Sequence, residues 1–356
     1  MQAKVFLSEV KHQNGKEDWH HHIQKLAEAV ELDRIVQDKD IVAIKLHFGE
    51  KGNRTHIQPR HIKPLVKIVK GRGASPFLAD TTVLYKSARS DAVSYLRLVH
   101  EHGFTIDKVG APVIIVDGVI GDSELDVEIN GKIFDQVSIA SEILKANSVL
   151  VVTHVTGHIA MGLGGTIKNL GMGLSSRKGK MRQHSAMKPK IIRSKCTACG
   201  LCIEWCPVDA ITMVEGAALI DSTRCIGCGE CLTVCRFDSV EYNWGVESTE
   251  LQRKTAEHAL GVVINRREKF VYFSYLINIT RDCDCFGTKM KPVIADIGVL
   301  ASTDPVAIDR AAIDLIAEKA GKPFRELFYP NLDETVQLEH AQEIGLGSMD
   351  YDLIRI

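Results

Sequence analysis

Apolar positions in the first part of the chain follow two alternating patterns, one typical of buried strands and one of amphipathic helices. Short apolar runs with strand character occur at 3–10, 40–49, 75–80, 111–118 and 147–155. Apolar residues at helical spacing fill stretches between them, at 21–36, 59–73 and 88–103. Because strands that alternate with helices are typical of βαβ units, this pattern predicts a mostly parallel sheet.

The same alternation returns in the last third of the chain. It predicts helices and strands at 249–260, 269–280, 292–300 and 302–321. The segment between the two parts has a different composition and contains most of the cysteines. We therefore predict an α/β fold, with a mostly parallel sheet flanked by helices, formed by residues 1–190 and 244–356. A small α+β insert at 191–243 interrupts this domain.

The composition is that of a folded globular protein, with 45% hydrophobic and 25% charged residues. A formal net charge of −1 does not favour nucleic acid or a membrane surface as the main partner. The N-terminal residues lack the basic head and apolar run of a signal peptide. An uncharged stretch at 146–167 contains His154, His158 and several glycines, which do not suit a lipid-facing helix. We therefore expect a cytoplasmic protein.

The ten cysteines are unevenly distributed: eight lie between residues 196 and 235, and the other two are Cys283 and Cys285. The eight form two runs, CTACGLCIEWCP (196–207) and CIGCGECLTVCR (225–236), each spaced C-x2-C-x2-C-x3-C. In the cytoplasm, cysteines in such numbers indicate metal or redox chemistry rather than disulfides. Zinc is the alternative metal for these cysteines, but zinc motifs normally use two separated pairs of cysteines.

This spacing is typical of [4Fe-4S] clusters, in which the fourth cysteine of each run binds the other cluster. One predicted cluster takes Cys196, Cys199, Cys202 and Cys235, and the other takes Cys225, Cys228, Cys231 and Cys206. The two runs resemble a bacterial two-cluster ferredoxin over residues 191–243, although Arg236 stands where a proline is common. The resemblance implies electron transfer, with a protein or a small redox molecule as the electron donor or acceptor.

Polar residues gather after three of the predicted strands, where open α/β sheets place their ligands. His47 and Arg54 follow one strand, and His158 and Lys168 follow another. Three glycines between His158 and Lys168 form either a nest of N–H groups for an anion or a tight turn without a ligand; they are Gly162, Gly164 and Gly165. The loop lacks the P-loop pattern for ATP. We expect the histidines to move protons and Lys168 to hold an anion or tether a cofactor.

Cys283 and Cys285 lie in the sequence TRDCDCFG, after the third of these strands. In an extended segment, side chains two residues apart point the same way, so both thiols can reach one atom. The neighbouring Arg281 and the position at a strand end favour thiols that bind a ligand or carry out redox chemistry. The alternative is a pair of buried cysteines that act as small apolar residues.

Four stretches resemble the family called domain of unknown function 362: VAIKLHFGE, GGTIKNLGMG, CDC and DIGVLASTDPVAID. The chain also resembles, more distantly, the nickel-pincer lactate racemase family. That resemblance aligns His158 with the catalytic histidine, Lys168 with the lysine that tethers a nicotinate-derived cofactor, and His184 with a nickel-binding histidine. Arg54 in GNRTHIQP is similar to that family's substrate arginine. The likeness implies an additional metal or organic cofactor, whereas the two cysteine runs and the CDC sequence depart from it.

Together these features predict an iron–sulfur redox protein whose two clusters exchange electrons with a pocket in the α/β domain. The predicted pocket contains His47, His158, Lys168, Cys283 and Cys285 and acts on a small anionic molecule. Two alternatives remain at this point. One is an electron carrier whose α/β domain only docks partner proteins, and the other is a nickel-pincer racemase or isomerase.

Overall fold

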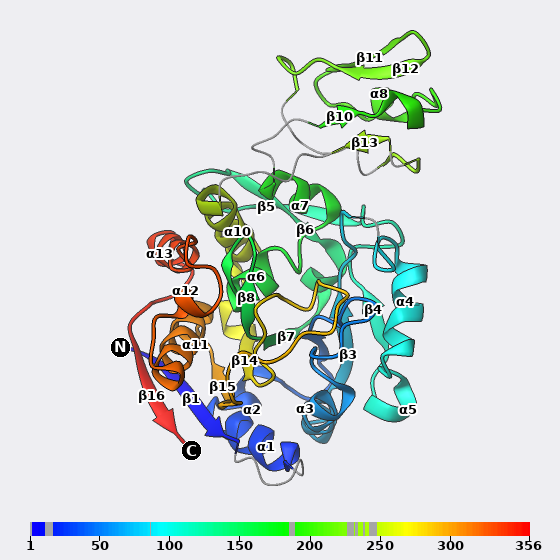
Figure 1. Ribbon diagram of the computed structural model, residues 1–356. Helices are drawn as coiled ribbons and strands as arrows, with labels where there is room; N and C mark the ends of the chain where they lie inside the picture. The colour runs from blue at the N-terminus through cyan, green and yellow to red at the C-terminus, as the bar shows by residue number, and fades with distance from the viewer. Residues whose placement is uncertain are drawn as a thin grey trace.

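The computed structural model describes residues 2–10, 17–85, 87–184, 189–225, 231, 234–237, 239–241 and 248–356. Its described residues form a large α/β domain around an eight-stranded sheet (Figure 1), in the order β16-β1-β15-β14-β7-β2-β3-β4. The strands are β1 (Ala3–Glu9), β2 (Ile41–Lys45), β3 (Ser75–Asp80), β4 (Val113–Ile115), β7 (Ser148–His154), β14 (Phe270–Leu276), β15 (Gly298–Ser302) and β16 (Tyr351–Arg355). This architecture confirms the predicted fold class.

Most neighbouring strands of the sheet are parallel. Strands β14, β7, β2, β3 and β4 pair in parallel, as do β1 and β16, while β15 runs antiparallel to both of its neighbours. Every residue of β7 and of β14 is buried, as expected for strands covered on both faces. The carboxyl ends of the parallel strands therefore meet at one edge of the sheet.

Helices cover both faces of the sheet and pack against two apolar cores. One face carries α1 (Trp19–Ala29), α2 (Leu32–Ile35), α3 (Pro59–Gly71), α4 (Ala92–Glu101) and α5 (Ile106–Val109). The other carries α6 (Thr166–Gly171), α10 (Ser248–Val263), α11 (Pro305–Ala320), α12 (Phe324–Leu327) and α13 (Val336–Glu343). Asp304 caps α11 by accepting from the N–H groups of Val306 and Ala307.

Shorter elements complete the α/β domain. They are the hairpins β5 (Glu124–Glu128) with β6 (Gln136–Ala140) and β8 (Thr156–His158) with β9 (Gly162–Gly164), helix α7 (Arg177–Gln183), and the 3-10 turns Ser141–Lys145 and Arg267–Lys269. No helix in the described part of the chain is long and apolar enough to cross a membrane.

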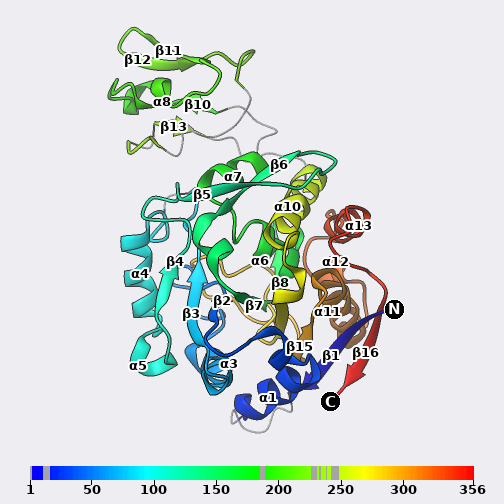
Figure 2. The same cartoon turned by 180° about the vertical axis from the view of Figure 1, so that it is seen from behind.

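The insert forms a small separate body. Its described elements are β10 (Lys190–Ile191), a 3-10 turn (Arg193–Lys195), α8 (Leu201–Glu204), β11 (Ile211–Val214), β12 (Ala217–Ile220) and β13 (Val240–Glu241). Strand β10 pairs with β13, so both ends of the insert lie side by side, and β11 pairs with β12. Figures 1 and 2 show the insert beyond α7, β5 and β6, away from both chain termini.

Several predicted elements are shorter than the sequence pattern suggested. The helix predicted at 21–36 is two helices, because Glu31 adopts a left-handed conformation between them. The strand predicted at 40–49 ends at Lys45, and the remaining residues form the loop that carries His47. Of the strand predicted at 292–300, only its last residues pair with neighbours, as part of β15.

Candidate functional site

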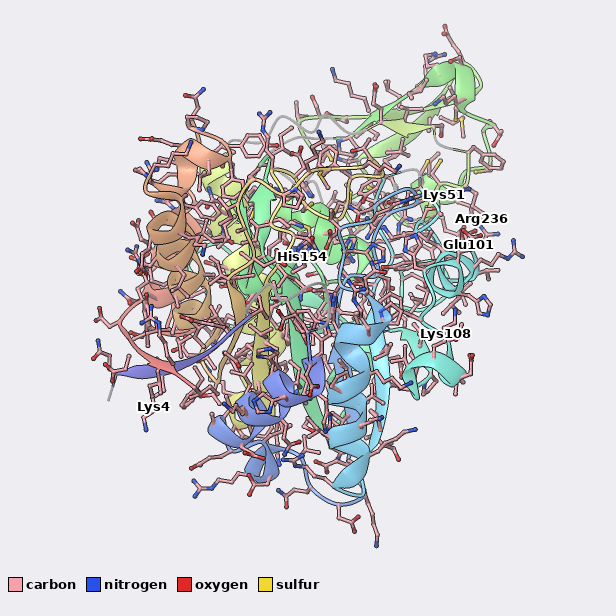
Figure 3. All side chains as sticks on the ribbon, turned by 60° about the horizontal axis from the view of Figure 1, so that its bottom comes forward. Lys4, Lys51, Glu101, Lys108, His154 and Arg236 are labelled. Atoms are coloured by element: carbon pink, nitrogen blue, oxygen red, sulfur yellow. The ribbon has the colours of Figure 1, made fainter. Side chains whose placement is uncertain are left out.

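A cavity of about 90 Å³ lies where the carboxyl ends of β2, β3 and β7 meet the loop after β14. Lys45, Asp80 and His154 line it from the ends of these strands, together with Cys283 and Cys285. Figure 3 shows His154 deep within the α/β domain rather than on its surface. This is the edge at which open α/β sheets place their ligands.

A second cavity, of about 730 Å³, adjoins the first. Both cavities share the lining residues Val83, Lys168, Met172, Lys180 and Cys285. Most of the other side chains that line the larger cavity are apolar. The lining also includes His158, His184 and Ser248. Its size is in the range of pockets that hold small organic ligands.

The CDC sequence folds into a tight turn instead of the extended segment that we predicted. The N–H group of Phe286 donates to the carbonyl of Cys283 at 3.0 Å, which closes a four-residue turn. The turn brings both cysteines to the wall of the smaller cavity, where each shifts the pKa of the other. Cys283 is buried, whereas Cys285 is partly exposed and lines both cavities.

Cys285 lies between two groups that stabilise a thiolate. Its sulfur is 3.4 Å from His47 Nε2 and 4.0 Å from Lys168 Nζ. The neighbouring thiol of Cys283, together with the charge of Lys168, holds the pKa of Cys285 well below its usual range. The same neighbour, Cys285, and burial raise the pKa of Cys283. Burial lowers the pKa of Lys168, but the two sulfurs outweigh it and raise that pKa above its usual value.

A buried ion pair anchors the turn between its two cysteines. His154 Nδ1 lies 2.8 Å from Asp284 Oδ2, and His154 Nε2 lies 2.8 Å from the carbonyl of Ile277. Both ring nitrogens thus face acceptors, so the ring is stabilised in its charged form. Burial opposes this charge, but Asp284 raises the pKa of His154, and His154 in turn lowers the pKa of Asp284 against the same burial.

The loop that carries His47 is joined to the CDC turn along its backbone. The N–H group of Glu50 donates to the carbonyl of Asp284 at 2.9 Å. Gly52 has a φ of +92° and lies so close to Gly287 that a Cβ on it would be 2.4 Å from the Gly287 carbonyl oxygen. The two loops therefore pack backbone against backbone, at positions where only glycine fits.

His47 receives one hydrogen bond and offers its other nitrogen to the cavity. The Gly49 N–H donates to His47 Nδ1 at 2.9 Å, so the neutral ring carries its proton on Nε2. That nitrogen faces both the sulfur of Cys285 and, at 2.7 Å, Arg89 Nη1. With its proton on Nε2, the neutral ring can donate to Cys285, but it cannot accept from the Arg89 guanidinium, which only donates.

Three buried cationic side chains near the site were not identified from the sequence. Arg89 is 2% exposed and pairs with Glu50 at 3.0 Å, and Lys45 pairs with Asp80 at 3.1 Å. Lys180 donates to the Thr81 hydroxyl at 2.8 Å, and burial lowers its pKa to about 8. A lysine inside the apolar run IVAIKL was the available signal for Lys45, whereas Arg89 and Lys180 stand in no recognisable motif.

His158 and His184 face the larger cavity as neutral rings. The N–H groups of Ala160 and Met161 donate to His158 Nδ1 at 3.1 and 3.0 Å, which places its ring proton on Nε2. Burial, reinforced by the charge of Lys168, lowers the pKa of His158 to about 3 and that of His184 to about 4. The structure thus brings both histidines and Lys168 to one cavity.

The remaining predicted residues have different surroundings. Arg54 is exposed and lines neither cavity. Gly164 and Gly165 line the smaller cavity, and Gly162, with a φ of +69°, packs against Glu334. The first N–H groups of α6 do not point to a free anion site, because those of Thr166 and Ile167 donate to the Asp309 carboxylate at 2.6 and 2.9 Å. The close packing of these glycines favours the tight-turn interpretation.

In the insert, four of the described cysteines gather around one cavity. Cys196, Cys199, Cys202 and Cys235 line one small cavity, and the N–H group of Ala218 donates to the Cys196 sulfur at 3.4 Å. The N–H group of Ala210 likewise donates to Cys206 at 3.2 Å. Cys228 lies outside the described residues. Among the residues that are described, no three His, Cys, Asp or Glu side chains are arranged to hold a single metal ion.

Comparison with solved structures gives two distant likenesses. The lactate racemase apoprotein from Thermoanaerobacterium thermosaccharolyticum is 9% identical with a TM-score of 0.46, and the alignment covers 90% of this chain and 58% of that one. A protein from Thermotoga maritima is 10% identical with a TM-score of 0.44, covering 85% and 59%. The chain thus spans less than two thirds of either protein. No curated protein matches it.

The comparison with protein families is more direct. The domain of unknown function 362 matches residues 42–314, a range that contains every strand end of the site, the CDC turn and the insert. Because this match covers well over half of the sequence, the chain belongs to the family described as domain of unknown function 362.

Proposed function

We propose that this protein is an iron–sulfur oxidoreductase that acts on a small anionic molecule at Cys285. The observation that carries the proposal is the position of the Cys285 sulfur, between Lys168 and His47 and at the junction of the two cavities. A thiolate that is stabilised, partly exposed and beside a proton carrier is suited to nucleophilic or redox chemistry.

The charges around the cavities support an anionic substrate. Lys45 and Arg89 are paired with carboxylates, whereas Lys168 faces the larger cavity with the Cys285 sulfur as its nearest anionic partner at 4.0 Å. A buried ammonium group that is only weakly paired attracts a carboxylate or phosphate. His47 can give the proton on Nε2 to a group formed beside Cys285, since that nitrogen already faces the sulfur.

The insert has the donor set for two [4Fe-4S] clusters. Four cysteines surround one cavity, which suits a cubane because each thiolate binds a different iron. Cys206, Cys225, Cys228 and Cys231 would hold the second cluster. Backbone N–H groups that donate to the sulfurs of Cys196 and Cys206 would stabilise their thiolate charge. When bound, the clusters supply one-electron transfer.

The path of the chain supports communication between the insert and the larger cavity. In the chain, His184 stands shortly before the insert (191–243) and Ser248 shortly after it, and both line this cavity. In Figure 2, the arrowhead of β3 points toward the end of the domain that carries the insert. Electrons would therefore enter or leave on the side where the site opens.

A second candidate function is that of a nickel-pincer isomerase. It is favoured by one observation, that His158, Lys168 and His184 line the same cavity. In that case Lys168 would tether the organic cofactor and the two neutral histidines would provide the catalytic base and a metal ligand. The exposed position of Arg54, outside both cavities, disfavours its role as the substrate arginine.

Metal analysis of anaerobically purified protein distinguishes the two candidates. An iron–sulfur oxidoreductase should contain about eight iron and eight sulfide per chain, and Cys199→Ser should remove or convert one cluster. Stoichiometric zinc, or an absence of iron after reconstitution, would contradict the proposal. Nickel together with a mass adduct on Lys168 would support the isomerase instead.

A further inference from the structure

We propose that Cys285 and Cys283 act as the attacking and resolving thiols of a dithiol that reduces an organic disulfide with anionic groups. This inference rests on the proposed function and names the class of its substrate. The geometry divides the two roles: Cys285 opens to the larger cavity, whereas Cys283 is 6% exposed and lines only the smaller one. A substrate in the larger cavity therefore meets Cys285 first.

The turn brings the second thiol within reach of the first. The hydrogen bond from Phe286 N to the Cys283 carbonyl folds the chain back, and both cysteines line the smaller cavity. Asp284, held by His154 at 2.8 Å, fixes the backbone between them. An extended CDC segment would strain a disulfide between residues two apart, whereas a turn brings such residues closer together.

The chemistry balances in two exchanges. In the first, the Cys285 sulfur bonds to one sulfur of the substrate, and the substrate S–S bond breaks to release a thiolate. In the second, the Cys283 sulfur bonds to that of Cys285, the mixed disulfide breaks to release the second thiolate, and the Cys283 proton passes to a departing sulfur. The substrate gains two electrons and the cysteine pair loses two.

Regeneration requires two electrons and one proton, which return the pair to a thiol and a thiolate. Reduced [4Fe-4S] clusters belong to the class of one-electron donors, and two of them match this requirement. Lys168 and the apolar walls of the cavity suit an organic body with a carboxylate or phosphate. The inference concerns the cysteines themselves, so its test does not depend on turnover.

The test uses dithiobis-nitrobenzoate, an aromatic disulfide with a carboxylate on each ring, and the full-length protein purified anaerobically. Trypsin releases residues 282–289, DCDCFGTK, which contain both cysteines and no others. After brief reaction, this peptide should be about 2 Da lighter, as expected for an internal disulfide. Treatment with a dithiol should restore its mass.

Variants assign the order of attack. Cys283→Ser should retain one nitrobenzoate thiol as a mixed disulfide on Cys285, whereas Cys285→Ser should leave the peptide largely unreacted. Lys168→Met should slow the reaction with this dianionic disulfide, because it removes the positive charge beside Cys285, and should slow it less with neutral dipyridyl disulfide. An unreacted wild-type peptide, or a stable mixed disulfide on it, would overturn the inference.

The two proposals fail in different ways. Protein that contains iron but leaves residues 282–289 unreacted would refute the dithiol role and retain the iron–sulfur function. Formation of the peptide disulfide in protein that never binds iron would retain the dithiol and refute the clusters as its electron source. Adducts on cluster cysteines are read separately, because they lie on other tryptic peptides.

Discussion

The α/β domain and the insert stabilise their interiors by different means. The domain buries two large apolar cores, one on each face of its sheet. The described core of the insert is small, with Ile211, Ala218 and Val240 beside Cys231, and other cysteines pack against it. A body of this size buries too little apolar surface to fold well alone, so small domains commonly rely on bound metal. The comparison leads us to expect that the α/β domain folds by itself, whereas the insert folds around its ligands.

Removal of iron should have the largest effect and should act on the insert alone. With its ligand sites empty, the insert is expected to lose its fold, while the α/β domain keeps its own. Hydrogen exchange before and after chelation measures this directly: protection should disappear in β11 and β12 and persist in β7 and β14. Equal loss in both bodies would show that the domain also depends on the clusters.

His154→Ala should have the converse effect. It leaves Asp284 as a buried carboxylate without its partner, which typically costs about 3–5 kcal/mol. Urea unfolding of the α/β domain should shift accordingly, whereas the iron content should remain unchanged. The matched variant is His20→Ala on the exposed surface of α1, which should leave the unfolding midpoint unchanged within error.

Acid should destabilise the α/β domain through its buried histidines. Burial lowers the pKa values of His56 and His184 to about 4, and those of His61, His158 and His258 to about 3, from an ordinary value of 6.5. Between these values the unfolded chain binds more protons than the folded one, so stability falls as the pH drops below 6.5. Each histidine contributes up to about 1.4 kcal/mol per pH unit in this window.

Urea unfolding at several pH values, monitored by signals from the α/β domain, checks this slope. His258→Leu should reduce it by about one proton, because the ring is fully buried and its Nε2 has no hydrogen-bond partner among the described residues. A free energy of unfolding that does not change between pH 6.5 and 4.5 would contradict the expectation, and so would a slope that His258→Leu does not change.

Arg54→Ala should have the smallest effect. The side chain is exposed and lies outside both cavities, so stability should change by less than about 0.5 kcal/mol. The rate at which residues 282–289 form their disulfide should also be unchanged. A marked loss of that rate would show that Arg54 reaches the substrate after all.

The sequence predicted the sheet better than the site. Apolar periodicity identified β2, β3 and β7, and with them the strand ends at which His47 and His154 stand. It missed β16, whose sides are only partly buried and so lack the strong apolar signal of the central strands. Local patterns carry information about single elements, and they are therefore best at finding long buried ones.

The contacts of the site arise between segments far apart in the chain. Cys285 meets His47 across more than two hundred residues, and Arg89 meets Glu50 from a loop that carries no motif. The CDC turn was misread as extended because its closing hydrogen bond is a backbone contact that leaves no trace in residue type. Spacing can nominate reactive residues, but only the fold decides which of them meet.

The glycine contact between the His47 loop and the CDC turn has a consequence for binding. Gly52 and Gly287 let the two backbones touch, and the bond from Glu50 N to the Asp284 carbonyl ties them further. Cys285 and His47 are thus preorganised before a ligand arrives. Their conformational entropy is lost on folding, so a substrate need not order them and keeps more of its interaction energy as affinity. A larger residue at either glycine would force the loops apart. Substrate binding would then have to order the two loops, and the affinity would fall.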